Sequence, residues 1–316
     1  MSKISVIIPT FNRKHLIDST INNLLNQSIQ PYEIIVVDDH STDGTIEYLE
    51  ATFGNTISVI VNTGKGPGSA RNTGFKHSSG EFIQFFDSDD LMTKNKLEIQ
   101  YNLLKNNVSR KIVYGPYLPA KFEDGHWIAT DVVMQYYPLP NKPLSYLIVQ
   151  GWCAITQSCL FTRELIEEIG PWREDLMPHE DKEYWYRLGK YAPNPIHENQ
   201  TCVIYRQHQQ QITDLHVNSI SRTKDGLNAF YIIEECAKKD RVPKYYLLRL
   251  KGLIASYKYF LCKFSSSPEL KHSDYLYILF ERILSKIGRI KTGTNWQKMY
   301  GPLNNSTIIQ YFLNNL

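Results

Sequence analysis

Short runs of β-branched and aromatic residues alternate with helix-forming segments along the first 90 positions of the chain. The sequence predicts strands at 4–8, 33–37, 57–61 and 82–86, and helices at about 13–27, 45–52 and 69–77. The predicted strands are largely apolar, as strands covered on both faces are. Strands and helices that alternate at this spacing form a mostly parallel sheet flanked by helices. The sequence therefore predicts an α/β fold.

Acidic residues follow two of these predicted strands at the point where each strand ends. Asp38 and Asp39 follow the second strand, and Asp87, Asp89 and Asp90 follow the fourth. In parallel α/β sheets, ligands bind outside the carboxyl ends of the strands. We therefore expect a binding site at this edge of the sheet.

The cluster formed by Asp87, Asp89 and Asp90 is the strongest candidate for a metal site. Three carboxylates within four residues repel one another unless a cation neutralises them. Mg²⁺ and Mn²⁺ prefer oxygen ligands, retain waters and bind substrate phosphates. The cluster is therefore typical of a cation that bridges the protein to a diphosphate; the alternative is a solvated acidic turn.

Asp39 and Arg71 are candidates for a nucleotide pocket. Acidic residues at strand ends hydrogen-bond nucleotides in related folds, so Asp39 could contact a base or ribose, or else cap a turn. Arg71 follows a glycine-rich segment that contains Gly64, Gly66 and Gly68. Its guanidinium could pair with a phosphate or with the acidic cluster, or it could be an ordinary surface arginine.

Two further positions have both a chemical and a structural interpretation. Glu180 and Asp181 stand at the start of a predicted amphipathic helix. There a carboxylate either stabilises the helix dipole or acts as a general base toward an incoming hydroxyl. His208 follows a short strand that ends at Tyr205, and it is either structural or a contact to a metal or phosphate.

Taken together, these segments resemble the family 2 glycosyltransferases, an inverting family with the GT-A fold. The resemblance covers about residues 3–212. It is carried by Val6–Asn12 (VIIPTFN), Ile34–Gly44 (IIVVDDHSTDG), Gly68–Gly74 (GSARNTG), Gly80–Asp90 (GEFIQFFDSDD), Glu180 and Asp181 with Trp185 and Arg187, and Tyr205–His208 (YRQH). Several motifs in order are far more specific than any one of them.

The resemblance implies a role for each matching position. The nucleotide-binding residues would be Pro9, Thr10, Asp39, Arg71, Asp87 and Asp89. The ligands of a Mn²⁺ or Mg²⁺ cofactor would be Asp89, with Asp90 sharing the metal, and His208. Asp181 would be the catalytic base, with Glu180 beside it.

The resemblance also implies a reaction and its partners. Asp181 would remove the proton of an acceptor hydroxyl as that oxygen displaces a nucleoside diphosphate from the sugar in one in-line step. The expected donor is a nucleotide sugar, with a UDP-sugar favoured over GDP- or dTDP-linked sugars. The expected acceptor is a glycan or a lipid-linked saccharide in bacterial surface polysaccharide or lipopolysaccharide assembly. The enzyme would be a metal-dependent glycosyltransferase of the hexosyltransferase type.

Charge divides the chain into two expected parts. Residues 1–212, the expected GT-A domain, carry 19 basic and 24 acidic residues, whereas residues 213–316 carry 16 basic and 8 acidic residues. The second part has a helical pattern, with helices expected near 219–239, 243–264 and 273–290. Its basic amphipathic helices could contact an anionic membrane surface, or could pack on the core or on a second subunit as a homo-oligomer.

Several features bear on location and on competing functions. The five cysteines form no C-x-x-C pair, and no run reaches the roughly 18 apolar residues of a spanning helix. No signal peptide begins the chain, so we expect a cytoplasmic protein, with peripheral attachment to the inner face of the cytoplasmic membrane as one alternative.

The competing function is a nucleotide-sugar or glycan binding protein with a non-catalytic GT-A domain. A nucleotidyltransferase would need a basic triphosphate loop after the first strand, and the segment 9–12 (PTFN) is not such a loop. We also expect no nucleic-acid partner.

Overall fold

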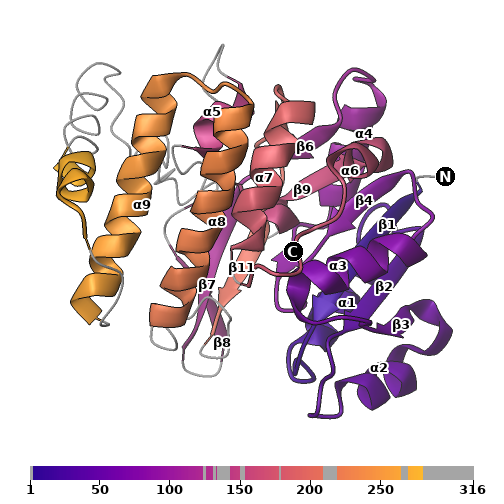
Figure 1. Cartoon of the computed structure of the whole chain (residues 1–316). Helices are drawn as coiled ribbons and strands as arrows, with labels where there is room; N and C mark the ends of the chain where they lie inside the picture. The colour runs from indigo at the N-terminus through magenta and orange to yellow at the C-terminus, as the bar shows by residue number, and fades with distance from the viewer. Residues whose placement is uncertain are drawn as a thin grey trace.

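The computed structural model describes residues 3–123, 126–130, 133, 143–149, 154–177, 179–208, 219–264 and 270–279. Two sheets and their flanking helices make up this part of the chain (Figure 1). The larger sheet has seven strands in the order β10-β6-β9-β4-β1-β2-β3, and the smaller has four in the order β5-β11-β7-β8.

The larger sheet confirms the predicted mostly parallel arrangement. Its strands are β1 (Ile4–Thr10), β2 (Glu33–Asp38), β3 (Ser58–Val61), β4 (Phe82–Phe85), β6 (Ile112–Tyr114), β9 (Cys159–Thr162) and β10 (Ile196–His197). The four strands expected from the first 90 residues are β1 to β4, and they run parallel to one another. Only β9 runs antiparallel to its neighbours β4 and β6. β1 is almost wholly buried, which explains its apolar sequence.

The smaller sheet meets the larger one at the end of β4. It is built from β5 (Leu91–Met92), β7 (Tyr117–Glu123), β8 (His126–Ala129) and β11 (Val203–Gln207). β11 pairs in parallel with β7 and antiparallel with β5. The acidic residues that follow β4 therefore lie in the connection between the two sheets.

Helices cover the sheets and account for most of the remaining described residues. They are α1 (Ile17–Leu25), α2 (Thr45–Phe53), α3 (Gly66–His77), α4 (Lys96–Lys105), α5 (Leu144–Ile148), α6 (Arg163–Ile169), α7 (Glu180–Tyr191), α8 (Ser219–Lys239) and α9 (Lys244–Phe264). α1 begins later than expected, and α3 begins three residues earlier, with Pro67 in its first turn.

A glycine lets α3 approach the sheet closely. A Cβ atom added at Gly74 would lie 2.3 Å from Cγ2 of Ile7 and 3.1 Å from Cγ2 of Val37. Any side chain at this position would overlap β1, so the close packing of α3 requires glycine. This packing fixes Arg71, on the same helix, at the carboxyl edge of the sheet.

The C-terminal helices share a core with the sheet domain. One cluster of buried apolar residues includes Phe85 of β4, Tyr184 of α7, Phe230 of α8 and Leu250 of α9. The expected helices at 219–239 and 243–264 are confirmed; residues 272–279 are also helical, and the rest of the third expected helix falls outside the described residues. Figure 1 shows α8 beside α7, with α9 beyond it. No helix within the described ranges is long and apolar enough to cross a membrane.

Candidate active site

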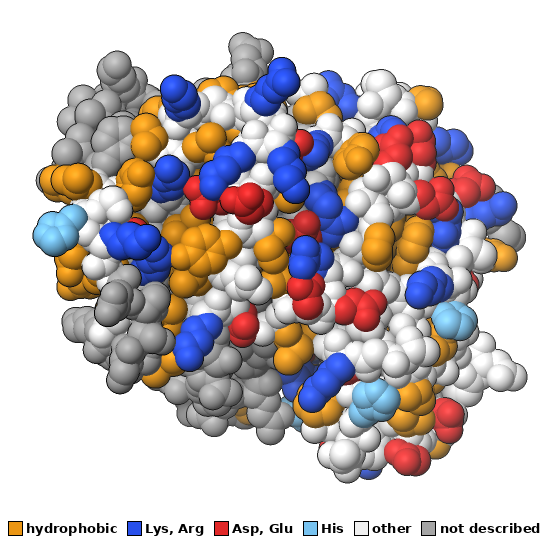
Figure 2. Space-filling view, viewed as in Figure 1, with side chains coloured by type: hydrophobic (Ala, Val, Ile, Leu, Met, Phe, Trp, Pro, Cys, Tyr) orange, Lys and Arg blue, Asp and Glu red, His pale blue; other side chains and the backbone are white. Residues whose placement is uncertain are grey.

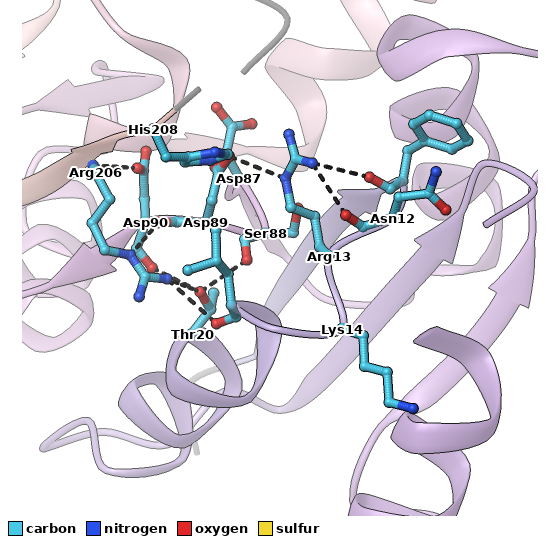
Figure 3. Close-up of polar contacts among 12 residues, drawn as sticks. Asn12, Arg13, Lys14, Thr20, Asp87, Ser88, Asp89, Asp90, Arg206 and His208 are labelled. Carbon is cyan, nitrogen blue, oxygen red and sulfur yellow. Dashed lines mark hydrogen bonds and ion pairs between the residues drawn. The ribbon is translucent and has the colours of Figure 1, made fainter. Parts of the chain in front are cut away.

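The acidic connection between β4 and β5 is held against the start of α1 (Figure 3). The hydroxyl of Thr20 lies 3.1 Å from the carbonyl oxygen of Ser88 and 3.0 Å from that of Asp90. These contacts fix the backbone of the connection, so its carboxylates project in set directions.

Asp89 lies between two groups that can carry positive charge. Its Oδ2 is 2.9 Å from Nε2 of His208 and 3.3 Å from Nε of Arg13. Burial raises the pKa of Asp89, but the hydrogen bond with His208 and the charge of Arg13 outweigh it, and the net pKa lies below its usual value. The structure thus brings two predicted metal ligands, Asp89 and His208, into direct contact.

Asp90 is oriented differently from Asp89. It is fully buried, and its two carboxylate oxygens accept hydrogen bonds from Nε2 of Gln157 at 2.7 Å and from the backbone N–H of Arg206 at 3.0 Å. Burial and the neighbouring Asp89 and Asp87 carboxylates hold the pKa of Asp90 well above its usual value. Because both oxygens of Asp90 accept hydrogen bonds from the protein, Asp90 stabilises the connection itself. This geometry favours Asp89 over Asp90 as the residue that faces a metal.

Arg206 is a site residue that the sequence interpretation missed. Its guanidinium donates to the carbonyl oxygen of Asp89, to Oγ of Ser19 at 2.7 Å and to Oγ1 of Thr20 at 2.9 Å. It therefore ties the end of β11, which directly precedes His208, to the acidic connection and to α1. The signal in the sequence was a lone arginine inside an otherwise uncharged strand, two positions before His208.

Arg13 was also missed, although it sits directly after the VIIPTFN segment. Its side chain is largely buried, and its Nη1 donates to the carbonyl oxygens of Phe11 and Asn12. Figure 3 shows the guanidinium of Arg13 directed at Asp89, while Lys14 points away. The backbone contacts hold this cation at the acidic connection.

Arg71 joins the acidic connection to the start of α7. Its Nη2 lies 3.2 Å from Oδ1 of Asp87, and its Nη1 lies 2.8 Å from Oε1 of Glu180. The guanidinium also lies over the ring of Trp172, 4.7 Å from its centroid, and Trp172 is stacked on Tyr184. Of the interpretations left open for Arg71, the structure shows the pairing with the acidic cluster, and Arg71 bridges two of the predicted acidic sites.

Burial makes ionisation of the bridged carboxyls less favourable. The pKa of Glu180 is raised, because burial and the adjacent Asp181 outweigh the attraction of Arg71. The pKa of Asp87 is raised as well, since burial and the charge of Asp89 oppose the effect of Arg71. Both carboxyls depend on Arg71 for compensation of their charge.

Asp181 and Glu180 occupy different environments despite being neighbours. Glu180 is buried and bound to Arg71, whereas Asp181 is partly exposed and accepts a 2.8 Å hydrogen bond from the backbone N–H of Lys182. Of the two, Asp181 is therefore the carboxylate that an external hydroxyl can reach.

The predicted nucleotide residues of β1 and β2 lie at the carboxyl edge of the same sheet. Thr10 is buried, and its hydroxyl makes no hydrogen bond within the described part of the chain. Pro9, the residue before it, is half-buried. Asp39 accepts hydrogen bonds from Nδ2 of Asn62 at 2.7 Å and from the backbone N–H of Gly66 at 2.8 Å, so it shapes the loop that precedes α3.

The donor set agrees with a cation that also binds substrate. Within the described residues, no three His, Cys, Asp or Glu side chains are grouped to hold a metal by themselves. Such an ion is usually held by one or two carboxylates together with substrate phosphates, so the Asp89 carboxylate fits it, and the His208 imidazole offers a nitrogen ligand beside that carboxylate. Both side chains are only slightly exposed, at 13% and 11%.

Comparison with known sequences decides the family. The model of Glycosyl transferase family 2 matches residues 5–170, which is more than half of the chain. The chain belongs to glycosyl transferase family 2. The family expected from the sequence motifs is therefore confirmed, and the match includes the acidic connection and Arg71.

Curated relatives of this family 2 member include a glucosyltransferase and an N-acetylglucosaminyltransferase. The chain is 30% identical over 230 residues to the Escherichia coli UDP-Glc:alpha-D-GlcNAc-diphosphoundecaprenol beta-1,3-glucosyltransferase WfgD, covering 72% of this chain and 86% of that protein. It is 37% identical over 146 residues to the Staphylococcus aureus poly(ribitol-phosphate) beta-N-acetylglucosaminyltransferase TarP, covering 42% of this chain and 45% of that protein. It spans only 34% of an uncharacterized glycosyltransferase of Rickettsia conorii.

Solved structures confirm the GT-A fold expected for this family 2 member. S. aureus TarS 1-349 in complex with UDP-GlcNAc superposes with a TM-score of 0.59 at 19% identity, covering 91% of this chain and 81% of that chain. The mannosyltransferase PcManGT from Pyrobaculum calidifontis, in complex with GDP-Man and Mn²⁺, gives 0.54 at 19% identity, covering 99% and 86%. At these identities the likeness concerns the fold.

Proposed function

We propose that this chain is an inverting, metal-dependent glycosyltransferase that transfers a hexose-type sugar from a UDP-sugar to a hydroxyl of a glycan or lipid-linked acceptor in bacterial cell-surface glycan synthesis. The relatives support the donor and acceptor classes, because WfgD is named for UDP-Glc and a diphosphoundecaprenol-linked acceptor, and TarP for a poly(ribitol-phosphate) acceptor. The observation that carries the proposal is the Arg71 bridge. It joins Asp87 of the acidic connection to Glu180 beside the proposed base.

The residues of this chain divide the work between a donor side and an acceptor side. On the donor side, Pro9, Thr10, Asp39, Arg71 and Asp87 are the proposed nucleotide residues, and Arg13 and His208 lie beside Asp89 where a diphosphate would bring negative charge. Asp89 and His208 would hold a Mn²⁺ or Mg²⁺ ion. When bound, such an ion neutralises charge on the leaving diphosphate.

On the acceptor side, Asp181 acts as the general base. It takes the proton of the acceptor hydroxyl while that oxygen forms its bond to the anomeric carbon. The bond from the anomeric carbon to the diphosphate oxygen breaks in the same displacement, and its electron pair leaves with UDP. A single displacement of this kind inverts the anomeric centre. Glu180, held by Arg71, fixes the chain next to Asp181.

The outer surface of the C-terminal helices bears on where the acceptor is met and on whether the chain associates with a second copy. Figure 2 shows Lys and Arg side chains mixed with hydrophobic ones, and with a few acidic ones, over the region where Figure 1 places α8 and α9. Tyr231 of α8 and Tyr245 and Tyr259 of α9 are exposed. Contact with an anionic membrane that carries a lipid-linked acceptor, and assembly as a homo-oligomer, remain predictions; sedimentation with anionic vesicles and light scattering test them.

The proposed donor and metal are tested by ligand-induced stabilisation. UDP, GDP, dTDP and CMP are each added with Mn²⁺ or with EDTA to the wild type, to Asp89→Asn and to the control Asp175→Asn, which changes an exposed carboxylate. A nucleotide present at about 100 times its Kd adds roughly 2.7 kcal/mol to the free energy of unfolding. We expect this increase for UDP with Mn²⁺ in the wild type and the control, and its loss in Asp89→Asn. Lack of response to every nucleotide would overturn the proposal; UDP binding without any transfer that depends on Asp181 would favour the non-catalytic binding protein.

A further inference from the structure

Both residues that flank Glu180 and Asp181 are held by the C-terminal helices. Lys182 extends from α7 toward α8 and α9, where its ammonium lies 4.9 Å from the ring centroid of Phe230 and 5.6 Å from that of Tyr257. Its Nζ also donates to the hydroxyl of Tyr257 at 3.3 Å. The two rings meet edge to face at 5.1 Å, so they form two walls of one small cage around the cation.

His179, on the other side of the pair, is held by the same tyrosine. Its backbone has a φ of 88°, in the left-handed region that is uncommon for residues other than glycine. Its ring lies edge to face with Tyr257 at 6.4 Å. A Cβ added at Gly226 of α8 would lie 2.6 Å from Cε1 of Tyr257 and 2.9 Å from Cδ2 of His179, so this contact is closely packed.

These contacts bear directly on Asp181. Its carboxylate accepts a hydrogen bond from the backbone N–H of Lys182, so its direction depends on where that residue is held. Adjacent residues of a helix do not face each other, and the Lys182 ammonium is directed into the aromatic cage, away from a pairing with Asp181. A carboxylate that must meet an acceptor hydroxyl loses rate steeply when it is displaced by even 1 Å.

We propose that Tyr257, together with Lys182, is a positioning device for the catalytic base. The inference rests on the proposed role of Asp181 as the base. Tyr257 fixes the start of α7 from both sides, through Lys182 and through His179, and so sets the direction of the Asp181 carboxylate. The basic C-terminal helices are then part of the catalytic unit, since the residue that orients the base belongs to α9.

The test measures kcat and KM for hydrolysis of UDP-glucose or UDP-N-acetylglucosamine, with water as the acceptor and UDP release as the signal. In Tyr257→Leu and Lys182→Met we expect kcat to fall on the order of tenfold, while KM for the donor and the stabilisation by UDP with Mn²⁺ stay unchanged. Tyr257→Phe keeps the ring, and Lys182→Arg keeps the cation over the rings, so both should restore most of kcat. Tyr259→Leu, which changes an exposed tyrosine of α9, is the matched control and should equal the wild type.

A double-mutant cycle separates positioning from general damage. In an Asp181→Asn background, Tyr257→Leu should have no further effect on kcat, because the group that it orients is already gone. Wild-type kcat in Tyr257→Leu, or a joint loss of kcat and donor affinity, would overturn the positioning role. If Asp181→Asn itself kept wild-type activity, the assignment of Asp181 as the base would be wrong. That outcome differs from failure of the positioning role, in which Asp181→Asn loses activity but Tyr257→Leu does not.

Discussion

The carboxylate of Asp89 lies 2.9 Å from Nε2 of His208, although the two residues are 119 positions apart in the sequence. The contact brings together the connection that follows β4 of the larger sheet and the residue that follows β11 of the smaller sheet. A pair of ligands from two such segments can hold one side of a cation while a diphosphate completes the other.

His208→Gln should therefore weaken metal-dependent binding of UDP roughly tenfold, because a ligand or close partner of the metal is lost. Binding of UDP in EDTA should change little. Calorimetric titration of UDP with and without Mn²⁺ measures both values. Equal losses with Mn²⁺ and with EDTA would show that His208 contacts the nucleotide or supports the fold, and would argue against a metal ligand.

Removal of Arg13 should strengthen binding of Mn²⁺ alone. The guanidinium of Arg13 occupies the cation-binding side of Asp89 at 3.3 Å, so a metal must compete with it. In Arg13→Gln we expect the Kd for Mn²⁺ without nucleotide to fall about fivefold, which corresponds to ~1 kcal/mol of ion-pair energy. Electron paramagnetic resonance of free Mn²⁺ measures this Kd. Lys14→Gln removes a neighbouring positive charge that points away from Asp89, and should leave the Kd near its wild-type value.

Arg71→Gln should destabilise the protein strongly, since it leaves Asp87 and Glu180 without their shared cation. Loss of one partner from a buried ion pair, which here is the pair of Arg71 with Glu180, costs about 3–5 kcal/mol. The contrast is Arg173→Gln, which breaks an exposed pair with Asp175 and should cost less than about 1 kcal/mol. Urea denaturation gives both free energies of unfolding. Similar costs for the two variants would mean that the Arg71 bridge is too hydrated to behave as a buried pair.

The sequence predicted β1 to β4 and the acidic connection because their signals are local. A strand covered on both faces must be apolar along its length, and carboxylates at its end are visible in a short segment. The roles of Arg13 and Arg206 could not be obtained in this way. The sequence around a single arginine does not reveal whether its side chain lies on the surface or in a buried network. The partners of Arg206, Ser19 and Thr20, are 187 and 186 positions away in the sequence.

Asp39 and Asp90 illustrate a related limit. Their positions at strand ends were read correctly, but the direction of each carboxylate depends on partners far along the chain. Asp90 is directed at Gln157, and Asp39 at Asn62 after β3 and at Gly66 at the start of α3. Sequence motifs locate such residues at the site, whereas long-range packing decides which of them can face a ligand.

Lys96 of α4 is a buried cation, and its burial predicts a pH dependence of stability. Its Nζ donates to Oε1 of Gln84 at 2.6 Å and to Oε1 of Gln100 at 2.9 Å. Burial lowers the pKa of Lys96 to about 8, from an ordinary value of 10.5. Between these two values the unfolded chain binds more protons than the folded chain, so the free energy of unfolding should rise with pH.

Relative to Lys96→Met, the wild type should therefore gain about 2 kcal/mol in free energy of unfolding between pH 8 and pH 10. Below pH 8 both states carry the proton, so the difference between the two proteins should become constant. Urea denaturation of both proteins from pH 7 to pH 10 measures this, with Lys105→Met, an exposed lysine of the same helix, as the control that should run parallel to the wild type. Parallel curves for Lys96→Met as well would mean that the amide oxygens of Gln84 and Gln100 compensate the buried charge fully, and that this network holds Lys96 charged throughout.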